Sequence, residues 1–452
     1  MNQTRVLTVG AYERDNFGDL LFLLLTERYL TGCEIVAAAP FAADMTPLLD
    51  RRVVALGDAL NDREFDVIWS VGGQIGGTTL ESALRMSKSP AEYAAFRAAD
   101  PVDKRALMRA ALHGAELASP YIPTPGAFGR NAAAISVLNS VGIAGARGLA
   151  PHVREEVFEV LRTTDVVSVR DRESSDFLSR IGVRHTLAPD VVHAISLLEP
   201  YDPDPGSDVV VVQFSTRLLR RFGHERLARE LVGSAHLGGL RIRLLMAGAA
   251  SSHDSVEDLE RVAEHVRALD AGREVEVLTD RRPLDIVHQI REARVVIGTS
   301  LHVRIIAAAY GLPRVTMRRA KPTRYATHWD AQMPFDVRIE DLGDAIGAAL
   351  AAGTRAEVRA GSERLSRLAD ENVRAIAERV GELVERGLDV ERKELAEHRQ
   401  RRYRSIANRR EACAVVTDVL RSELAEARRE LELSRAEVER LRRRVPIRLR
   451  AR

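Results

Sequence analysis

Short apolar runs, many of them β-branched, alternate with amphipathic stretches through about the first 350 residues of the chain. Apolar runs of this length fit buried strands, and apolar residues every three or four positions fit helices that cover a sheet. The pattern predicts strands at 5–9, 34–38, 66–71, 133–138, 166–169 and 184–187, and again at 209–214, 241–246, 275–278, 295–298 and 314–317. Strands that alternate with helices are typical of α/β proteins, so we expect two parallel, Rossmann-like sheets.

A polar segment separates the two groups of strands. It reads YDPDPGSD at 201–208, and proline, glycine and aspartate in this density continue neither helix nor sheet. We therefore predict an N-terminal α/β domain over 1–203 and a C-terminal α/β domain over 208–353, facing each other across a cleft. A polar, proline-rich stretch at about 85–125 predicts a helical insertion near that cleft.

The remaining residues, 354–452, predict a helical tail rich in arginine and glutamate. Neither glycine nor proline occurs from 388 to 445, so a long helix or helix pair should end at Pro446. Steps of four and three residues, typical of a coiled coil, connect Leu420, Leu424, Ala427, Leu431, Ser434, Val438 and Leu441. Because Ala427 and Ser434 bury little surface, a coiled-coil homodimer over 417–444 and a solvated single helix both stay open.

The charge composition limits the classes of binding partner that we expect. The 452 residues include 67 basic and 65 acidic ones, and this net charge of +2 points to no nucleic acid. The stretch from Arg440 to the end holds seven arginines and no acid, which predicts peripheral contact with an anionic membrane. No aromatic-studded basic surface accompanies these arginines, so nucleic acid stays the poorer partner.

The expected cellular location rests on the cysteine content and on the lack of two sequence features, a signal peptide and a long apolar run. It has two cysteines far apart, Cys33 and Cys413, which fits a reducing compartment. The first residues do not read as a signal peptide, and no apolar run approaches the ~20 residues that span a bilayer. We expect a cytoplasmic protein, peripheral at the inner face of the membrane.

Two glycine-containing turns follow predicted strands of the first domain. The first turn contains Asn16, Gly18 and Asp19, with Asp19 suited to cap a helix that begins at residue 20. The second contains Gly72 and Gly73. Ligands of open α/β sheets bind at such carboxyl ends of strands, and a helix N-terminus attracts anions. A tight turn with an N-cap explains the first turn equally well.

Charged side chains follow two further strands. Arg170 and Asp171 come directly after the strand at 166–169, and Asp190 ends the next one. A guanidinium at the carboxyl edge can bind a carboxylate or phosphate with two hydrogen bonds. Pairing of Arg170 with Asp171 or Glu173 is the structural alternative, and Asp190 is either a turn cap or a cleft carboxylate.

The junction at 295–304 combines a hydroxyl, an imidazole and a guanidinium. His302 lies in the first helical turn after a buried strand, beside free backbone N–H groups, which suits acid catalysis on an anion. Ser300 and Arg304 are four residues apart and share a helical face, so both could reach one ligand. A structural hydrogen bond from His302 is the alternative. No cluster with metal-ligand spacing occurs.

In this order, the segments GAYERDNFGD, VGGQ, VVSVRDRES, APD and GTSLHVRIIAAAYGLP resemble the polysaccharide pyruvyltransferase family, over roughly residues 4–350. The resemblance implies a GT-B-like fold and transfer of a pyruvyl group from phosphoenolpyruvate to two hydroxyls of one sugar, without a cofactor or metal. Arg170 and His302 would then be catalytic residues of the donor site, with imidazolium His302 protonating the methylene carbon. Residues implied to bind substrate are Asn16, Gly18, Asp19, Gly72, Gly73, Asp171, Asp190, Ser300, Leu301 and Arg304.

One motif departs from the family. Many members carry Arg-Leu-His where this chain has Ser300-Leu301-His302, and Arg304 could supply the missing charge. The expected acceptor is a sugar or lipid-linked glycan of a cell-surface polysaccharide. Two alternatives remain: a GT-B glycosyltransferase that uses a nucleotide sugar, and an inactive relative whose tail acts as a scaffold.

Overall fold

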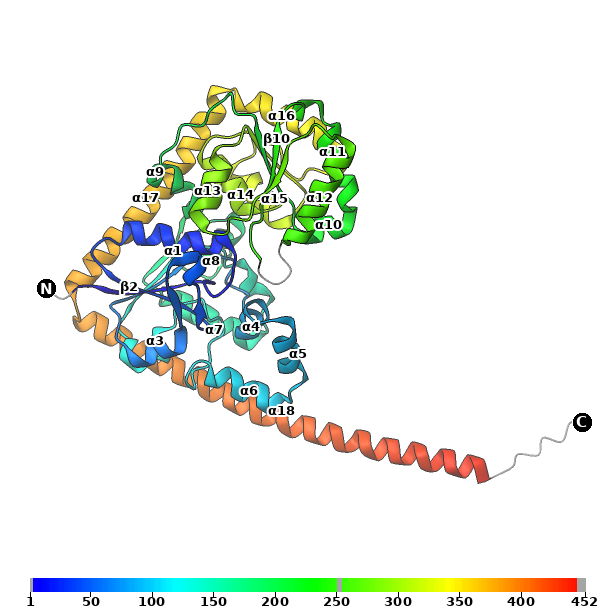
Figure 1. Cartoon of the computed structure of the whole chain (residues 1–452). Coiled ribbons are helices and arrows are strands. Elements are labelled where there is room, and N and C mark those ends of the chain that lie inside the picture. Colours follow the sequence, from blue (N-terminus) through cyan, green and yellow to red (C-terminus); the bar gives the residue numbers. More distant parts are fainter. Residues whose placement is uncertain (1–2, 250–253, 445–452) are drawn as a thin grey trace, which may run out of the picture. The chain divides into compact units, whose positions relative to one another are not determined.

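Two parallel sheets with flanking helices make up most of the protein. The structure, a computed structural model, describes residues 3–249 and 254–444. Residues up to Gln400 form one compact unit that contains both sheets, and Arg401 onward belongs to a second unit (Figure 1). The predicted class, α/β with two parallel sheets and a long C-terminal helix, is confirmed.

The strands run in chain order as follows. Those of the first sheet are β1 (Arg5–Val9), β2 (Glu34–Ala39), β3 (Ala43–Asp44), β4 (Arg52–Ala55), β5 (Val67–Val71), β6 (Ile135–Val141), β7 (Val166–Val169) and β8 (Thr186–Leu187). Those of the second are β9 (Val209–Gln213), β10 (Arg241–Leu244), β11 (Val275–Val277), β12 (Val295–Gly298) and β13 (Arg314–Thr316).

The first nine α-helices are α1 (Phe17–Tyr29), α2 (Thr46–Leu49), α3 (Leu56–Asp62), α4 (Leu80–Ser87), α5 (Pro90–Ala98), α6 (Pro101–Ala110), α7 (Pro151–Arg162), α8 (Arg172–Arg180) and α9 (Ile195–Leu198). The others are α10 (Thr216–Phe222), α11 (His224–Gly233), α12 (Val256–Leu269), α13 (Pro283–Arg291), α14 (Leu301–Ala309), α15 (Ala320–Trp329), α16 (Leu342–Gly353), α17 (Ala356–Arg386) and α18 (Val390–Arg444). A 3-10 helix, η4 (Val191–Ala194), follows β8.

The first sheet has the order β3-β4-β2-β1-β5-β6-β7-β8, and only the β3–β4 pair is antiparallel. Each predicted strand is present, with ends shifted by a few residues. Strands β3 and β4 were not predicted. The reason is their length, because β3 has two residues and β4 has only three apolar residues, preceded by charged ones. Helices α4, α5 and α6 stand between β5 and β6.

The second sheet has the order β11-β10-β9-β12-β13, and every pair is parallel. Its central strand β9 reads VVVVQ and is buried along its whole length. β-Branched residues with both faces covered are typical of such a position. Because all five strands point the same way, their carboxyl ends meet at one edge.

Helix α1 lies between the two sheets. Its sequence FGDLLFLLLTERY is apolar on nearly every side, as expected for a helix packed on all faces. Residues from both sheets, Val6 and Val67 of the first and Val211 and Val296 of the second, share one apolar cluster with α1. The backbone N–H of Phe17 also donates to the carbonyl of Ala247, at 3.3 Å, after β10. The two sheets are therefore joined through α1, which packs against elements of both.

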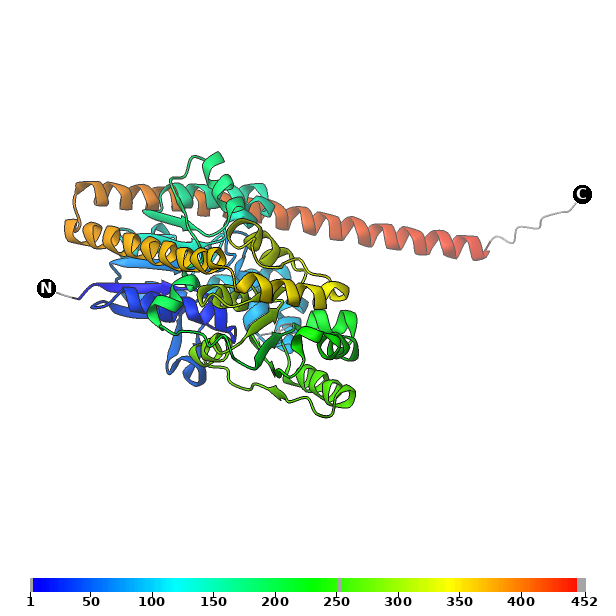
Figure 2. The same ribbon diagram turned by 90° about the horizontal axis from the view of Figure 1, so that it is seen from above.

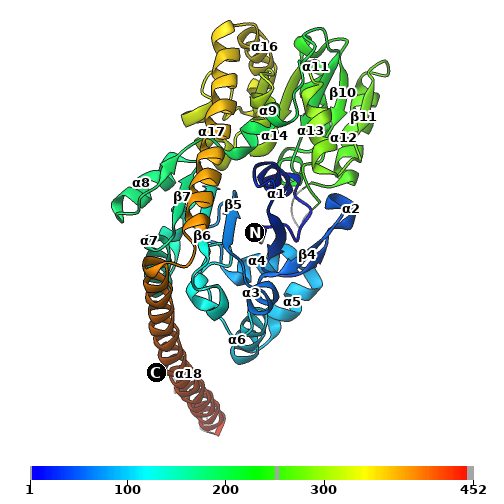
Figure 3. The ribbon, with the colours of Figure 1, turned by 90° about the vertical axis from the view of Figure 1, so that its left-hand side faces the viewer.

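Helix α17 contacts β6 of the first sheet, η4, which follows β8, and α14, which follows β12 of the second sheet (Figure 2, Figure 3). Nine of its residues are buried, among them Val373 and Ile376 in the shared apolar cluster. Although 354–452 was predicted to form one tail, residues 354–400 belong to the compact unit.

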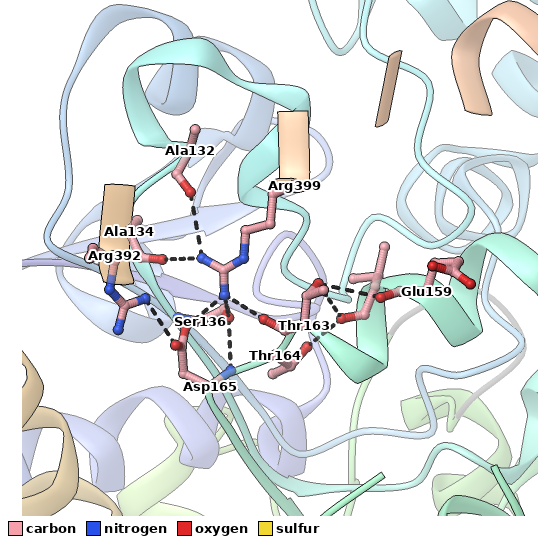
Figure 4. Close-up of polar contacts among 10 residues, drawn as sticks. Ala132, Ala134, Ser136, Glu159, Thr163, Thr164, Asp165, Arg392 and Arg399 are labelled. Atoms are coloured by element: carbon pink, nitrogen blue, oxygen red, sulfur yellow. Dashed lines mark hydrogen bonds and ion pairs between the residues drawn. The ribbon is translucent and has the colours of Figure 1, made fainter. Parts of the chain in front are cut away.

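The first turns of α18 are fixed by a buried arginine. Arg399 is 5% exposed, and its guanidinium donates to the carbonyl of Ala134 and to Ser136 Oγ at 3.0 and 2.9 Å. It also pairs with Asp165 at 2.8 Å, and Arg392 reaches the other oxygen of that carboxylate at 2.9 Å (Figure 4). These groups lie where β6 and β7 begin, at the edge opposite the strands' carboxyl ends.

Beyond Gln400, α18 continues to Arg444 in the second unit. Within the described residues, no helix combines the length and the apolar character needed to cross a membrane.

Candidate functional site

Charged side chains from both sheets meet beside α1. Arg170 follows β7 and Asp190 follows β8, while His302 lies in the first turn of α14, after β12. The carboxyl ends of parallel strands position all three, as open α/β sheets do with ligand-binding residues. The predicted convergence of Arg170 and His302 is thereby realised around one aromatic ring, Phe22 of α1.

Phe22 forms the floor of this cluster. The His302 ring stands edge-on to it, with ring centroids 5.2 Å apart, and the Arg170 guanidinium lies 5.6 Å from the Phe22 centroid. Gly72 has a φ of +68°, and a Cβ atom there would lie 2.1 Å from the Phe22 ring. The glycine is required on both counts, for its backbone conformation and for space.

Arg170 and Asp190 form a fully buried ion pair, 1% and 0% exposed. Burial alone would raise the pKa of Asp190, but the charges of Arg170 and His302, together with hydrogen bonds from Val192 and Arg170, hold that pKa below its usual range. Side chains of α15 complete the contact: Trp329 Nε1 donates to the carbonyl of Arg170, and the N–H of Asp190 donates to Tyr325 Oη, at 2.8 and 2.9 Å. The predicted pairing of Arg170 with Asp171 or Glu173 is wrong.

Arg170 keeps one free donor. Its Nη2 atom is buried and has no hydrogen-bond partner in the described part of the chain. Leaving such a donor unpaired costs free energy, so buried exceptions call for an explanation. A bound anion would satisfy it.

His302 is 5% exposed, and its Nε2 is likewise buried without a partner among the described residues. Burial lowers its pKa to about 4, helped by the charges of Lys321 and Arg170 and opposed by Asp190 and Asp19. The imidazole is therefore neutral at neutral pH in this structure. The alternative considered for His302, a structural hydrogen bond, is not made by Nε2 within the described residues.

Gly18 is what allows His302 to approach the first sheet. A Cβ atom on Gly18 would lie 1.7 Å from His302 Nδ1. The α1 N-cap, however, is Asn16, whose Oδ1 accepts from the N–H of Gly18 at 3.2 Å. The prediction that Asp19 caps a helix beginning at residue 20 is wrong. Asp19 lies inside the first turn and pairs with Arg14 at 2.8 Å.

Sequence reasoning missed Arg14 and Glu13, which lie in the same loop. Arg14 Nε is buried without a partner in the described chain, and Arg14 Nη1 reaches Met86 Sδ in α4 at 2.9 Å. Burial raises the pKa of Glu13 to about 7, although Arg14 opposes the shift. Tyr121 Oη donates to Glu13 Oε1 at 3.2 Å.

Lys321, at the start of α15, was missed as well. It is partly buried and makes no ion pair within 4.0 Å in the described residues. Burial and the charge of Arg170 lower its pKa to about 8, against the opposing charges of Asp19 and Asp190. Only four of the 67 basic residues are lysines, at positions 88, 104, 321 and 393. A lysine after a strand of the second sheet was therefore a signal available in the sequence.

Three other predicted substrate-binding residues serve local structure. Asp171 caps α8 by accepting from the N–H of Ser174 at 2.8 Å, and it also accepts from Gln74 Nε2 at 3.4 Å. Leu301 lies in the apolar cluster between the sheets. The carbonyl of Gly73 accepts from the N–H of Gly142, at 2.8 Å, which ties two loops together.

Arg304 does not share a ligand site with Ser300. Its guanidinium donates to Thr316 Oγ1 and to the carbonyls of residues 330, 333 and 334, at 2.9 to 3.0 Å, and it pairs with Asp330. We therefore assign Arg304 a structural role, which corrects the prediction that it replaces the missing arginine. The N–H of Ser300 donates to Gln213 Oε1 at 2.9 Å, while its side chain makes no cap hydrogen bond.

Comparison with solved structures gives distant similarities. The glycosyltransferase SnogD from Streptomyces nogalater is 14% identical, with a TM-score of 0.41 over 85% of this chain and 99% of that one. The UDP-GlcNAc 2-epimerase of Methanocaldococcus jannaschii, in complex with UDP-GlcNAc and UDP, is 10% identical, with a TM-score of 0.43 over 82% and 100%. No curated protein sequence gives a significant match.

The family comparison is more specific. The sequence pattern of polysaccharide pyruvyl transferases matches residues 16–319, which is 304 of the 452 residues. The match extends from the N-cap of α1 to the residue before α15, and so includes Arg170, Asp190 and His302. On this evidence the chain belongs to the polysaccharide pyruvyl transferase family.

Proposed function

We propose that this protein transfers a pyruvyl group from phosphoenolpyruvate to two hydroxyls of one sugar, forming a cyclic ketal in a cell-surface polysaccharide or its lipid-linked precursor. The observation that carries the proposal is the pair of cations beside His302, Arg170 and Lys321, with partner-free buried nitrogen atoms on Arg170 and His302 in the described chain. The charge of Arg14, which also has a partner-free buried nitrogen there, acts on Lys321 as well. Family membership supports the reaction class.

Phosphoenolpyruvate suits this cluster by charge. It carries a carboxylate and a phosphate, so it needs fixed cations and N–H donors in a site with little water. Arg170 is held rigid by Asp190, which leaves Nη2 as a directed donor. Lys321 contributes a positive charge that no carboxylate of the described chain neutralises by direct pairing.

In the proposed reaction, a proton adds to the methylene carbon C3 and leaves an oxocarbenium-like centre at C2. One sugar hydroxyl attacks C2 and loses its proton, and the second hydroxyl displaces phosphate from the same carbon. Two hydroxyl protons are released: one balances the proton added at C3, and the other leaves with phosphate. The products are the ketal and inorganic phosphate, and no redox or metal step is needed.

His302 is the proposed acid. A neutral imidazole cannot perform this step, so the protonated form has to be favoured by the substrate. A bound dianion next to His302 supplies negative charge, which raises the pKa of a histidine. Binding of the donor would therefore create the acid that the reaction requires.

Calorimetric titration with phosphoenolpyruvate tests the donor assignment. The parent protein should bind phosphoenolpyruvate, and Lys321→Gln should bind at least ~10-fold more weakly because one cation is lost, which is about 1.4 kcal/mol. Lys393→Gln, at an exposed lysine on α18, is the matched control and should bind like the parent.

UDP-GlcNAc in the same titration separates the alternatives. Tighter binding of UDP-GlcNAc than of phosphoenolpyruvate would replace this proposal with a nucleotide-sugar glycosyltransferase. A protein that binds neither compound would favour the scaffold alternative.

The proposed location is the cytoplasmic face of a membrane, where lipid-linked acceptors are available. The predicted membrane contact through the stretch from Arg440 remains a prediction, since 445–452 lie outside the described residues.

A further inference from the structure

The second unit carries an exposed apolar stripe. In its described part it is helical, and Leu420, Leu424, Leu431 and Val438 are between 48% and 58% exposed. With Ala427 and Ser434 they form the seam, a set of residues separated by steps of four and three. Such spacing places the side chains on one narrow line, which suits a single partner helix.

The positions beside the seam carry opposite charges in strict order. With residues 424, 431 and 438 at heptad position a, position d falls on residues 420, 427 and 434. Position e is then arginine each time, at 421, 428, 435 and 442, and position g is glutamate each time, at 423, 430 and 437. In coiled coils these two positions decide which helix pairs and in which orientation.

Pairs within the helix do not explain this pattern. Glu423 and Glu430 have no basic residue three or four positions away on either side, because those positions hold Val, Leu, Glu, Ala and Ser. Helical ion pairs form at these spacings and not at others. The two glutamates therefore have no basic residue at ion-pairing spacing on their own helix.

We propose that residues 413–441 form a parallel, in-register coiled coil with a second copy of this chain. In that arrangement position g faces position e of the other helix five residues further on. Glu423 then meets Arg428 of the second copy, and Glu430 meets Arg435. An antiparallel pair would set arginine against arginine and glutamate against glutamate, so the charges select the parallel form.

The seam makes this dimer dependent on its charges. Ala427 and Ser434 are small, so they allow close approach of the helices but bury little apolar surface. The flanking ion pairs then contribute a larger share of the binding than in a leucine-rich seam. Because exposed pairs are screened by ions, the dimer should weaken as salt rises.

Cys413 provides a direct test of orientation. It occupies position d one heptad before Leu420, and it is exposed. In a parallel, in-register dimer the two Cys413 side chains face each other across the seam. In an antiparallel dimer they lie at opposite ends. Cys33, partly buried in the first unit, is the matched control.

Mild oxidation of the full chain should join two copies through a Cys413 disulfide, two thiols giving up two protons and two electrons to the added oxidant. Cys33→Ser should cross-link like the parent. Cys413→Ser should give no covalent dimer, yet light scattering should still show twice the chain mass of 50.0 kDa. A dimer that never cross-links through Cys413 refutes the parallel register.

Charge exchange tests the contacts themselves. The variant with Glu423→Arg and Glu430→Arg, and the variant with Arg428→Glu and Arg435→Glu, should each dimerise at least ~10-fold more weakly than the parent. An equal mixture of the two should restore dimers, because unlike charges then face each other. A monomeric parent at about 10 μM, or no recovery on mixing, overturns the proposal.

Discussion

His302 is held by packing rather than by hydrogen bonds. Phe17 and Phe22 meet its ring edge-on, Gly18 lies against Nδ1, and Nε2 has no partner among the described residues. Burial accounts for the largest part of its pKa shift. A histidine in this setting is costly to protonate in the folded state, and the cost has a measurable consequence for stability.

His302→Gln should reduce the loss of stability in acid. The pKa of His302 is about 4 when folded and about 6.5 in an unfolded chain, so between these values the unfolded chain binds more protons. Stability of the parent therefore falls as pH drops from about 6.5 to 4, by about 3 kcal/mol from this residue. Urea unfolding at pH 7 and pH 4 should show the parent losing more than the variant.

Buried His193 also has a pKa of about 4 and is present in both proteins, so it cancels in the comparison. The same variant should lose turnover by ~10²- to 10⁴-fold if His302 is the acid. Equal pH dependence in both proteins would mean that His302 is not the buried titrating group.

Sequence motifs located Arg170, Asp190 and His302 because each directly follows a strand, and strand ends converge in this fold. They could not tell Arg304 from Lys321. Both are cations near the ends of strands of the second sheet. Only the structure shows that both terminal nitrogens of Arg304 donate to Thr316 and to the carbonyls around residue 333, and that Asp330 pairs with it. Hydrogen bonds between distant residues leave no periodic trace in a sequence.

At the scale of elements, the first turns of α18, up to Gln400, belong to the compact first unit. Arg399 closes the starting edge of β6 and β7 by bonding to Ala134, Ser136 and Asp165 (Figure 4). Burial raises the pKa of Asp165, but Arg399 and Arg392 together keep it below its usual range. The absence of glycine and proline from 388 to 445 predicted the helix. Its docked start could not be predicted, because it depends on a buried arginine that resembles its exposed neighbours in sequence.

Arg399→Ala should destabilise the first unit strongly. It leaves the carbonyls of Ala132, Ala134 and Thr163 and part of a buried carboxylate without this donor, a loss of about 3–5 kcal/mol. Arg392→Ala is the matched control, because it removes one hydrogen bond to the same carboxylate and should cost less. Thermal unfolding followed by circular dichroism compares the two, and equal melting temperatures would contradict the anchoring role.

Over the whole molecule, glycines at a few positions allow the elements of the two sheets to approach each other closely. Gly18 accommodates His302, and a Cβ atom on Gly248 would lie 2.6 Å from the carbonyl oxygen of Asp15. Pattern analysis predicted both sheets and the linker between them. It could not predict how closely they pack, because that depends on contacts between residues more than 200 positions apart.

Gly18→Ala should separate the sheets locally while leaving each one folded. The new methyl group overlaps the His302 ring, and overpacking of this kind costs about 1–3 kcal/mol. We expect weaker phosphoenolpyruvate binding and a higher pKa for His302, measured by NMR titration of its ring protons. Gly343→Ala is the control, since its helical position has open space around it. An unchanged His302 pKa in Gly18→Ala would argue against the contact.

The close contact between Gly18 and the His302 ring also has a consequence for the kinetics. In the proposed reaction the buried imidazole of His302 has to reach the methylene carbon of phosphoenolpyruvate, so we expect each catalytic cycle to include one movement that parts α1 from α14 and one that closes them again. Such large-scale motion works against solvent friction. Turnover should therefore decrease as added glycerol raises the viscosity of the solvent. This dependence on viscosity should be lost in any variant in which α1 and α14 are already separated.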